Sequence, residues 1–231
     1  MIPRLAAFAY WVFTYLLFVA VVIYFGGFIA NRYVPSTIDS GLQLPESEAL
    51  LRDLELLGAF GIQHSLMARP FFKRWIPWPV ERTTYMLASC IALIAIFVLW
   101  EPIPDLVWNL AGGFWLRIVA AAGLVLVVWA SLTTGHWDTF GFRHARAYLR
   151  RREYAPLPFR VRGPYRWSRH PMMLGVILIL WATPQMSKGH LLFSAVLTLY
   201  VIAGSWLEER DLLRRFPVEY EHYRTRVRMF V

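Results

Sequence analysis

Apolar residues gather in six runs separated by polar segments. The runs cover residues 5–30, 54–68, 83–100, 114–133, 171–186 and 190–207. About 20 predominantly apolar residues suffice to cross a bilayer as a helix, and only helices or closed barrels satisfy backbone hydrogen bonds inside lipid. The pattern therefore predicts an all-α fold, a polytopic integral membrane helix bundle with about five or six transmembrane helices.

Two of the six runs are short for a full crossing. In the run 54–68, charged residues precede the apolar stretch, so this segment is either a tilted helix shielded by its neighbours or a re-entrant segment. In the run 171–186, Pro184 ends the apolar stretch after about a dozen residues. The short turn 184–189 then joins it to the last run, so these two segments are predicted to form a helical hairpin.

Composition supports a membrane location. Hydrophobic residues make up 58% of the 231 residues and the mean hydropathy is +0.44, whereas soluble domains average about 45–50% apolar residues. The first run is too long for a signal-peptide core and lacks a small-residue cleavage site, so we expect a retained transmembrane helix. The single cysteine, Cys90, excludes a disulfide within the chain and is interpreted as a small core residue.

The net charge of +9 is distributed as a topology signal rather than as a nucleic-acid surface. With six crossings, nearly all lysines and arginines fall on one side of the membrane; the exceptions are Arg32, Arg52, Arg117 and Lys188. Positively charged residues stay on the cytoplasmic side, so both termini are predicted to be cytoplasmic and no nucleic-acid partner is expected.

The long cytoplasmic stretch 136–170 contains an amphipathic segment. One helical face would carry Phe142, Ala145 and Leu149, and another would carry Arg143, Arg146 and Arg150. Such a helix lies on a membrane surface, where its arginines contact anionic lipid headgroups. Asp138, which precedes this helix, either caps it or faces the functional site.

The run R-G-P-Y-R-W-S-R-H-P-M-M-L-G, residues 162–175, places basic groups directly before an apolar segment. Pro171 suits the first helical position, because its fixed φ favours a helix start. The amides of residues 172–174 would then be unpaired and, with the positive end of the helix dipole, would form an anion site. Mobile positive charge comes from Arg166, Arg169 and His170.

Two carboxylates return to the same side of the membrane. Glu208 and Glu209 follow the last apolar run, and carboxylates in the last turn of a helix oppose its dipole. Such a broken local rule is expected at functional sites. A site with anion-binding groups on one wall and carboxylates on the other suits a zwitterionic ligand, such as an amino acid with a further cationic centre.

Several other kinds of site are excluded. The sequence has no G-x-G-x-x-G after a strand, no P-loop and no G-x-S-x-G elbow. The six histidines form no close pair and there is no second cysteine, so no metal is expected. The polar residues Gln63, His64 and Ser65 end the weak run 54–68; they would face a cavity or a neighbouring helix.

The motifs together resemble the isoprenylcysteine carboxyl methyltransferase superfamily. The C-terminal pattern is G-P-Y-R-x-x-R-H-P at 163–171, L-E-E-R-D-L at 207–212, and Tyr220, Tyr223 and Val227. The upstream runs resemble the methanethiol S-methyltransferase branch: G-I-Q-H-S-L-M-A-R-P at 61–70, P-V-E-R-T-T-Y at 79–85, D-T-F-G-F-R at 138–143 and W-A-T-P-Q-M-S-K-G-H-L-L-F at 181–193. The resemblance covers nearly the whole chain.

This resemblance implies a bacterial cytoplasmic-membrane enzyme that transfers a methyl group from S-adenosylmethionine to a small thiol, converting methanethiol to dimethyl sulfide. The resemblance implies cofactor contacts at Tyr165, Arg169, His170, Glu208 and Glu209. The predicted anion site and the C-terminal motif add Arg166, Met172 and Tyr223 as cofactor contacts. The chain is treated as a single membrane domain, 1–231, with transmembrane helices in 1–133 and a cofactor-binding catalytic region in 134–231.

Two departures from the superfamily pattern bear on the substrate. Met173 stands where much of the superfamily has a tyrosine, and no arginine precedes the acidic pair, where residues 203–206 read A-G-S-W. The second departure favours a small neutral thiol over a charged, prenylated substrate.

The thiolate is the nucleophile, yet a free alkyl thiol is mostly protonated at neutral pH. His64 is the candidate that accepts the proton or orients the thiol, and Arg143 is the candidate that stabilises the thiolate. Two alternatives remain open: a membrane methyltransferase of the isoprenylcysteine-carboxyl or lipid type, and a non-enzymatic membrane accessory protein.

Overall fold

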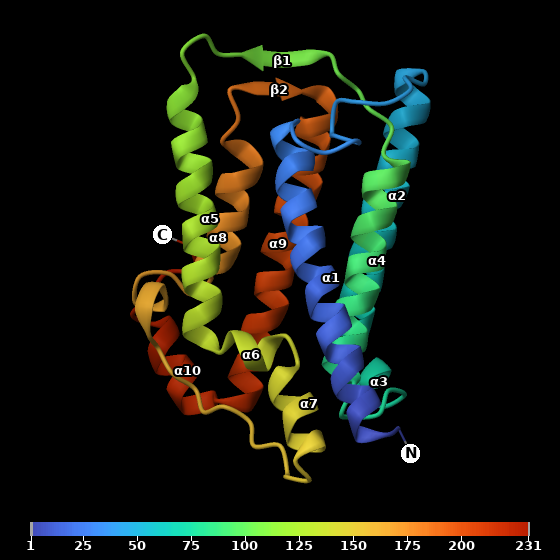
Figure 1. The fold of residues 1–231 in the computed structure, drawn as a ribbon. Helices are drawn as coiled ribbons and strands as arrows, with labels where there is room; N and C mark the ends of the chain where they lie inside the picture. The colour runs from blue at the N-terminus through green and yellow to red at the C-terminus, as the bar shows by residue number, and fades with distance from the viewer. Residues whose placement is uncertain (1, 231) are drawn as a thin grey trace. The chain divides into compact units, whose positions relative to one another are not determined.

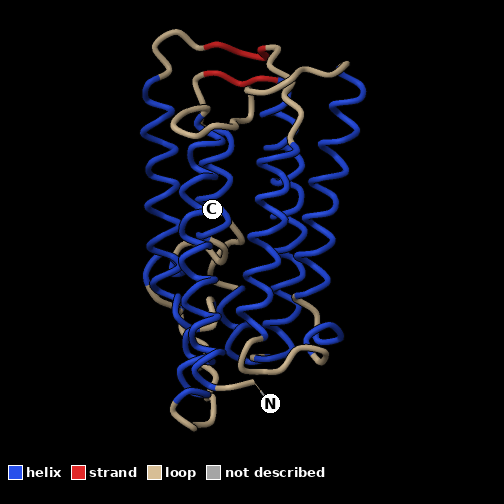
Figure 2. The backbone as a smooth tube through the Cα atoms, turned by 45° about the vertical axis from the view of Figure 1, so that its right-hand side comes forward, coloured by secondary structure: helices blue, strands red, loops and turns tan. Residues whose placement is uncertain are grey.

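The computed structural model describes residues 2–230, and the chain divides into two compact units. The first unit comprises Met1–Pro104 with Trp137–Pro156, and the second comprises Asp105–His136 with Leu157–Val231. Helices dominate both units, and within the described residues the strands are two short segments (Figure 2). The all-α prediction from hydropathy is confirmed.

The first unit is built on three long helices that lie side by side (Figure 1). These are α1 (Arg4–Ala30), α2 (Glu46–Met67) and α4 (Glu81–Leu99), with the short helices α3 (Pro70–Lys73), α6 (His136–Thr139) and α7 (Phe142–Leu149). Helix α4 packs against both α1 and α2, and α7 packs against α1.

Aromatic side chains fill the core at one end of this unit. Phe28 is fully buried, with its ring 5.2 Å from that of Phe97 and 6.2 Å from that of Trp100. The Trp100 indole donates a hydrogen bond to the carbonyl of Ile38 at 3.0 Å, and the buried Asp53 carboxylate accepts one from the Glu101 amide at 3.0 Å. The first bond holds the connection 31–45 against the end of α4, and the second holds α2 there.

The second unit contains the remaining elements. They are β1 (Leu106–Asn109), α5 (Phe114–Thr134), the 3-10 helix η1 (Gly163–Arg166), α8 (Pro171–Trp181), β2 (Gln185–Ser187), α9 (Lys188–Arg215) and α10 (Pro217–Arg224). Helices α8 and α9 form the predicted hairpin and contact each other, and α8 also packs closely on α5. This hairpin brings the start of α8 and the later part of α9 to one end of the unit (Figure 1).

A small antiparallel sheet lies at the turn of the hairpin, where the sequence predicts only a turn. Leu106 pairs with Ser187, Trp108 with Met186 and Asn109 with Gln185. The Ser187 side chain then accepts a hydrogen bond from the His190 amide and so caps α9. Strands this short leave no apolar alternation to detect, because the pairing rests on backbone hydrogen bonds between distant segments.

Within residues 2–230, four helices are long and apolar enough to cross a membrane: α1, α4, α5 and α9. In the most apolar window of α5 only 11% of the residues are buried, so the face of this helix that does not pack on α8 is free to contact lipid. The weak run 54–68 forms the second half of the 22-residue α2, and the run 171–186 forms the 11-residue α8. A crossing by either of these two helices stays a prediction.

Candidate active site

Helix α8 begins as the sequence predicts. Pro171 takes the first helical position and His170 is the N-cap residue, whose side chain makes no capping hydrogen bond. The start of α8 therefore keeps the positive dipole end and the first amides without a side-chain cap. One detail differs from the prediction, because the Leu174 amide donates to the His170 carbonyl at 3.0 Å. Of the three amides predicted to bind an anion, those of Met172 and Met173 therefore remain.

His170, Arg169 and Glu209 form a compact charge cluster. The Nε2 atom of His170 and the Nε atom of Arg169 each lie 3.1 Å from Oε1 of Glu209. The exposed fractions of these side chains are 4%, 14% and 13%, respectively. Because both cations contact the same carboxylate oxygen, Glu209 ties Arg169 and His170 to α9.

Glu208 lies on the more exposed side of the same helix. Its side chain is 54% exposed, and its Oε2 atom is 3.6 Å from Nδ1 of His170. Adjacent residues point about 100° apart on a helix, which explains why one glutamate enters the cluster while its neighbour faces outward. Both carboxylates nevertheless approach the two nitrogens of one imidazole ring.

The predicted end of the last helix is wrong. Helix α9 continues to Arg215, so Glu208 and Glu209 lie more than one turn before its end, and the last turn carries Arg214 and Arg215 instead. The expected conflict with the helix dipole is therefore absent, since that effect is confined to the terminal turn. Pairing with His170 and Arg169 accounts for the position of Glu209 instead.

The loop before α8 is held by the C-terminal segment. The Arg169 amide donates to the Arg228 carbonyl at 3.0 Å, and the His170 amide donates to the Met229 carbonyl at 3.1 Å. The Phe230 ring lies 6.1 Å from the His170 ring. The contribution of residues 228–230 cannot be predicted from the sequence pattern, because backbone pairing leaves no side-chain pattern.

Tyr223 also positions this loop. Its buried hydroxyl donates to the Tyr165 carbonyl at 2.6 Å and lies 3.3 Å from the Ser168 carbonyl. Burial raises the pKa of the Tyr223 phenol, so the group stays a hydrogen-bond donor at neutral pH. The predicted role of Tyr223 as a cofactor contact stays a prediction, and its observed partners are backbone carbonyls.

Tyr220 belongs to the C-terminal motif but is not among the predicted cofactor contacts. It is 1% exposed, and its hydroxyl has no hydrogen-bond partner within the described residues. Burial, and after it the charge of Glu209, raises the pKa of this phenol. A buried hydroxyl without a partner costs about 1–3 kcal/mol, and a bound polar molecule can satisfy it.

The other predicted cofactor contacts surround the cluster with different degrees of burial. Tyr165 is half-buried, and burial raises the pKa of its phenol, which is hydrogen bonded to Thr134 of α5. Met172 is half-buried in the first turn of α8, and Arg166 is exposed. All eight predicted cofactor contacts thus belong to the second unit.

An apolar pocket of about 220 Å³ adjoins the same loop. Ser168 and Pro171, which lie on either side of the Arg169–His170 pair, contribute to its wall. The remaining lining residues are Leu126, Pro164, Trp167, Leu174 and Phe230. Because Phe230 also lies beside the His170 ring, this pocket and the charge cluster share one residue.

His64 occupies the contact between α2 and α4 in the first unit. Its Nε2 atom is hydrogen bonded to the Tyr85 hydroxyl, and its Nδ1 atom lies 3.0 Å from the Ser89 hydroxyl. Since Ser89 donates its own proton to the Tyr85 carbonyl at 3.0 Å, Ser89 accepts from Nδ1 and Tyr85 donates to Nε2. Both imidazole nitrogens are thus engaged with α4, as in interhelical hydrogen bonding.

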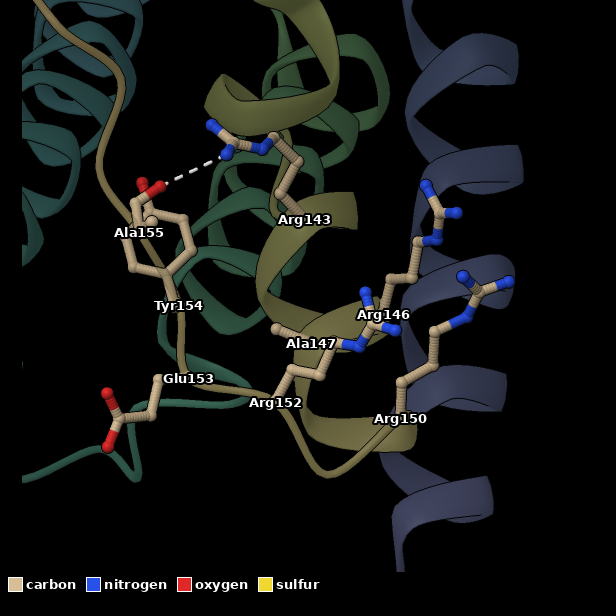
Figure 3. Close-up of a pocket in the computed structure, with 8 residues that line it drawn as sticks. All are labelled: Arg143, Arg146, Ala147, Arg150, Arg152, Glu153, Tyr154 and Ala155. Carbon is tan, nitrogen blue, oxygen red and sulfur yellow. Dashed lines mark hydrogen bonds between the residues drawn. The ribbon is translucent and has the colours of Figure 1, made fainter.

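Arg143 belongs to a cluster around Asp138. The Asp138 carboxylate lies 3.3 Å from Arg143 and 3.4 Å from Arg82, and it accepts hydrogen bonds from the Tyr154 hydroxyl at 2.8 and 3.0 Å. Arg143 also donates to the Ala155 carbonyl at 3.1 Å (Figure 3). Asp138 therefore gathers cations and does not cap α7, whose N-cap is Gly141.

His144 is buried next to this cluster. Its ring stacks on that of Tyr154, with centroids 3.8 Å apart. Burial, followed by the positive charge of Arg82, lowers the pKa of His144 to about 4. The imidazole is therefore neutral at physiological pH, and no motif in the sequence marks His144 as a functional residue.

The two predicted catalytic residues and the eight predicted cofactor contacts belong to different units. His64 and Arg143 lie in the first unit, where each has its own hydrogen-bond partners. Within residues 2–230, no group of three or more histidine, cysteine or acidic side chains could hold a metal ion.

Comparison with known proteins gives close and nearly full-length matches. The chain is 40% identical to a methanethiol S-methyltransferase of Crocosphaera subtropica, a match that covers 96% of this chain and 90% of the relative. It is 41% identical to methanethiol S-methyltransferase 2 of Bradyrhizobium diazoefficiens over 100% of this chain and 92% of the relative. It is 36% identical to the protein of that name from Mycobacterium tuberculosis over 94% and 92%. No protein-family model and no solved structure matches the chain.

Proposed function

Because this chain belongs to the methanethiol S-methyltransferase family, we propose that it transfers the methyl group of S-adenosylmethionine to methanethiol and forms dimethyl sulfide. The observation that carries this proposal is the similarity to proteins of that name over nearly the whole chain. The proposal treats residues 1–231 as one membrane domain of the bacterial cytoplasmic membrane, with both termini in the cytoplasm and with lipid, but no metal or nucleic acid, as a further partner.

The residues around His170 have the chemistry that a sulfonium nucleotide requires. S-adenosylmethionine, when bound, supplies a methyl group on a positively charged sulfur, together with a carboxylate, an ammonium group and ribose hydroxyls. The amides at the start of α8, with Arg166, would hold the carboxylate. Glu208, the more exposed member of the acidic pair, would hold the ammonium or the ribose hydroxyls.

The unpaired Tyr220 hydroxyl supports this location of the cofactor. It is buried, its pKa responds to the charges of Glu209 and Arg169, and it has no partner within the described residues. A polar group of the cofactor would supply the missing partner and remove the desolvation penalty. Glu209 would act mainly by holding Arg169 and His170 in place, since its Oε1 atom contacts both.

The acceptor side needs a route for the proton of the thiol, because the thiolate is the nucleophile. We retain His64 as the group that accepts the thiol proton or orients the thiol, with the Tyr85 hydroxyl as a relay because it donates to His64 Nε2. Arg143 would stabilise the thiolate, since it shares the single Asp138 carboxylate with Arg82 and is not fully neutralised by it.

Calorimetric titration and a methyl-transfer assay test the proposal together. Purified protein should bind S-adenosylmethionine and should transfer its labelled methyl group to methanethiol in preference to amines and lipids. A variant with both Glu208→Ala and Glu209→Ala should lose cofactor binding, whereas His64→Ala should bind the cofactor but lose turnover. Full activity of the double variant would overturn the assignment of the cofactor site. Preferred methylation of a lipid or an amine would overturn the assignment of the acceptor.

A further inference from the structure

A cavity of about 250 Å³ lies between α7 and the chain segment that follows it (Figure 3). Four of its lining side chains are arginines and one is a glutamate: Arg143, Arg146, Arg150, Arg152 and Glu153. The cavity is slightly smaller than the pockets of about 300–1,000 Å³ that hold drug-sized ligands. Its size and lining suit a compact anion.

The backbone forms this cavity by a sharp turn at the end of α7. The Arg152 amide donates to the Ala147 carbonyl at 2.9 Å and the Arg151 amide donates to the Tyr148 carbonyl at 3.2 Å, the two bonds of a Schellman motif. Arg151 takes the left-handed position with φ +56°, where glycine is usual and another residue costs roughly 1 kcal/mol. The turn carries Arg152 back toward the arginines of α7.

The positive charge of the cavity is poorly compensated by the protein itself. Arg143 pairs with Asp138, but within the described residues no ion pair joins Arg146, Arg150 or Arg152 to a carboxylate. Figure 3 shows these three guanidinium groups on one side of the cavity, whereas the Glu153 carboxylate points to the other side. Like charges four residues apart on a helix repel each other, so a bound anion would stabilise this arrangement.

Its surroundings place the cavity at the level of lipid headgroups. Helix α7 packs against α1, and the Tyr148 hydroxyl donates to the Ile2 carbonyl at 2.7 Å, just before the first residue of that apolar helix. The Tyr148 ring also contacts Trp78, with centroids 5.7 Å apart, and Trp78 and Trp75 are both exposed. Exposed tryptophans at the end of apolar helices mark the membrane–water interface.

We propose that this cavity binds the headgroup of an anionic phospholipid. The phosphate would lie on the guanidinium groups of Arg146, Arg150 and Arg152, which form strong charge-assisted bonds to phosphate oxygens. The four arginines outnumber the single Glu153, and this net positive charge favours a phosphatidylglycerol headgroup, which is anionic, over zwitterionic phosphatidylcholine. Glu153 would accept hydrogen bonds from the glycerol hydroxyls. None of the lining residues is among the eight proposed cofactor contacts, and Arg143, which also has a proposed role toward the thiolate, is not one of the three arginines proposed to hold the phosphate.

The full-length protein in neutral detergent provides the test, with three probes: dihexanoyl phosphatidylglycerol, dihexanoyl phosphatidylcholine and inorganic phosphate. We expect phosphatidylglycerol to raise the thermal unfolding midpoint at concentrations at which phosphatidylcholine does not. Inorganic phosphate should need at least a tenfold higher concentration for the same effect. Equal potency of phosphatidylcholine would overturn the preference for an anionic headgroup, and equal potency of inorganic phosphate would overturn a lipid as the ligand.

Two double variants, each lacking two positive charges, test whether phosphatidylglycerol binds in this cavity. Arg150→Gln with Arg152→Gln removes two charges from the cavity and should weaken binding of phosphatidylglycerol roughly thirtyfold. Arg151→Gly with Arg160→Gln removes two charges from the same stretch outside the cavity lining and should retain the affinity. Unchanged affinity of the first double variant would overturn the proposal. If that variant does not fold, the comparison of the three probes on the unsubstituted protein still decides it.

Discussion

Tyr220 and Tyr223 lie about one turn apart on α10, but their hydroxyl groups have different surroundings. The Tyr220 hydroxyl is buried without a partner in the described residues, whereas the Tyr223 hydroxyl donates to the Tyr165 carbonyl. Tyr220→Phe should therefore leave the unliganded protein as stable or up to about 1 kcal/mol more stable. The same substitution should weaken binding of S-adenosylmethionine about tenfold, since a hydrogen bond to a charged or strongly polar group is lost.

Tyr223→Phe is the matched control for this prediction. It removes a satisfied hydroxyl that holds the loop before α8, so it should lower the free energy of unfolding by about 1–2 kcal/mol. Thermal unfolding and calorimetric titration of both variants separate the two effects. Unchanged cofactor affinity in Tyr220→Phe would show that its hydroxyl does not meet the ligand.

His144 makes the stability of the first unit depend on pH. Burial and the nearby Arg82 lower its pKa to about 4 from an ordinary 6.5, so the unfolded chain takes up this proton more readily than the folded one. The neutral His144 imidazole therefore favours the folded state fully above about pH 6.5. This contribution to the free energy of unfolding decreases as the pH falls toward 4. Between pH 7 and pH 5 the loss should be about 2 kcal/mol.

The His144→Phe variant tests this pH dependence. Phenylalanine keeps a flat ring against Tyr154 but cannot be protonated, so its unfolding midpoint should change less between pH 7 and pH 5 than that of the unsubstituted protein. Denaturation monitored by circular dichroism at several pH values measures the difference. An identical pH profile in both proteins would contradict the assignment to His144.

Helix α8 depends on close contact with α5 at one pair of glycines. A Cβ atom added at Gly175 would lie 2.6 Å from the Gly123 carbonyl oxygen and 2.8 Å from a methyl group of Val127. Small residues allow membrane helices to approach this closely. Gly175→Ala should therefore force the helices apart and lower the free energy of unfolding by about 1–3 kcal/mol.

Gly204→Ala in α9 is the control for this packing effect. A Cβ atom at Gly204 would have no heavy atom within 4 Å, and alanine favours a helix over glycine by about 0.5–1 kcal/mol. The control should therefore be slightly more stable than the unsubstituted protein. Thermal unfolding in detergent measures both variants, and equal stability of Gly175→Ala and Gly204→Ala would contradict the proposed contact.

At the level of elements, hydropathy predicted where the helices lie in the sequence but not how far they extend. The last apolar run ends at residue 207, yet α9 continues to Arg215, because glutamate, arginine and leucine are good helix formers in water. The start of α8 was predictable, since the chemistry of Pro171 is local. A hydropathy pattern thus marks the lipid-facing part of a helix, and local propensity decides its end.

The candidate site was predictable only where its residues belong to local motifs. The approach of His170 to Glu209 follows from the hairpin, which returns two apolar segments to the same end. The pairing of Arg169 and His170 with Arg228 and Met229, and the bonds of Asp138 to Tyr154 and Arg82, join segments far apart in the sequence. Neither periodicity nor a motif specifies such contacts, because they depend on how the helices pack.

At the scale of the whole molecule, the charge distribution predicts a membrane topology that depends on whether α2 crosses the membrane. The positive-inside rule places the basic loop 69–82 in the cytoplasm and the connection 31–45 on the opposite side, provided that α2 crosses the membrane. Helix α2 is 22 residues long, which is sufficient for a bilayer core of about 30 Å, although its first half carries charged residues. A re-entrant α2 would instead leave both loops on one side.

Cysteine labelling distinguishes these two topologies. In a Cys90→Ala background, single cysteines at Gln43 and Ala68, both exposed positions at opposite ends of α2, can be treated with a membrane-impermeant maleimide in intact cells. We expect Gln43→Cys to be labelled from outside the cytoplasmic membrane and Ala68→Cys to be labelled only after the membrane is permeabilised. The Cys90→Ala background lacks the single native thiol, so labelling reports only the introduced cysteines. Labelling of both positions from the same side would show that α2 enters the membrane without crossing it, and the burial of Asp53 at the Glu101 amide would then be the interaction that anchors a re-entrant helix.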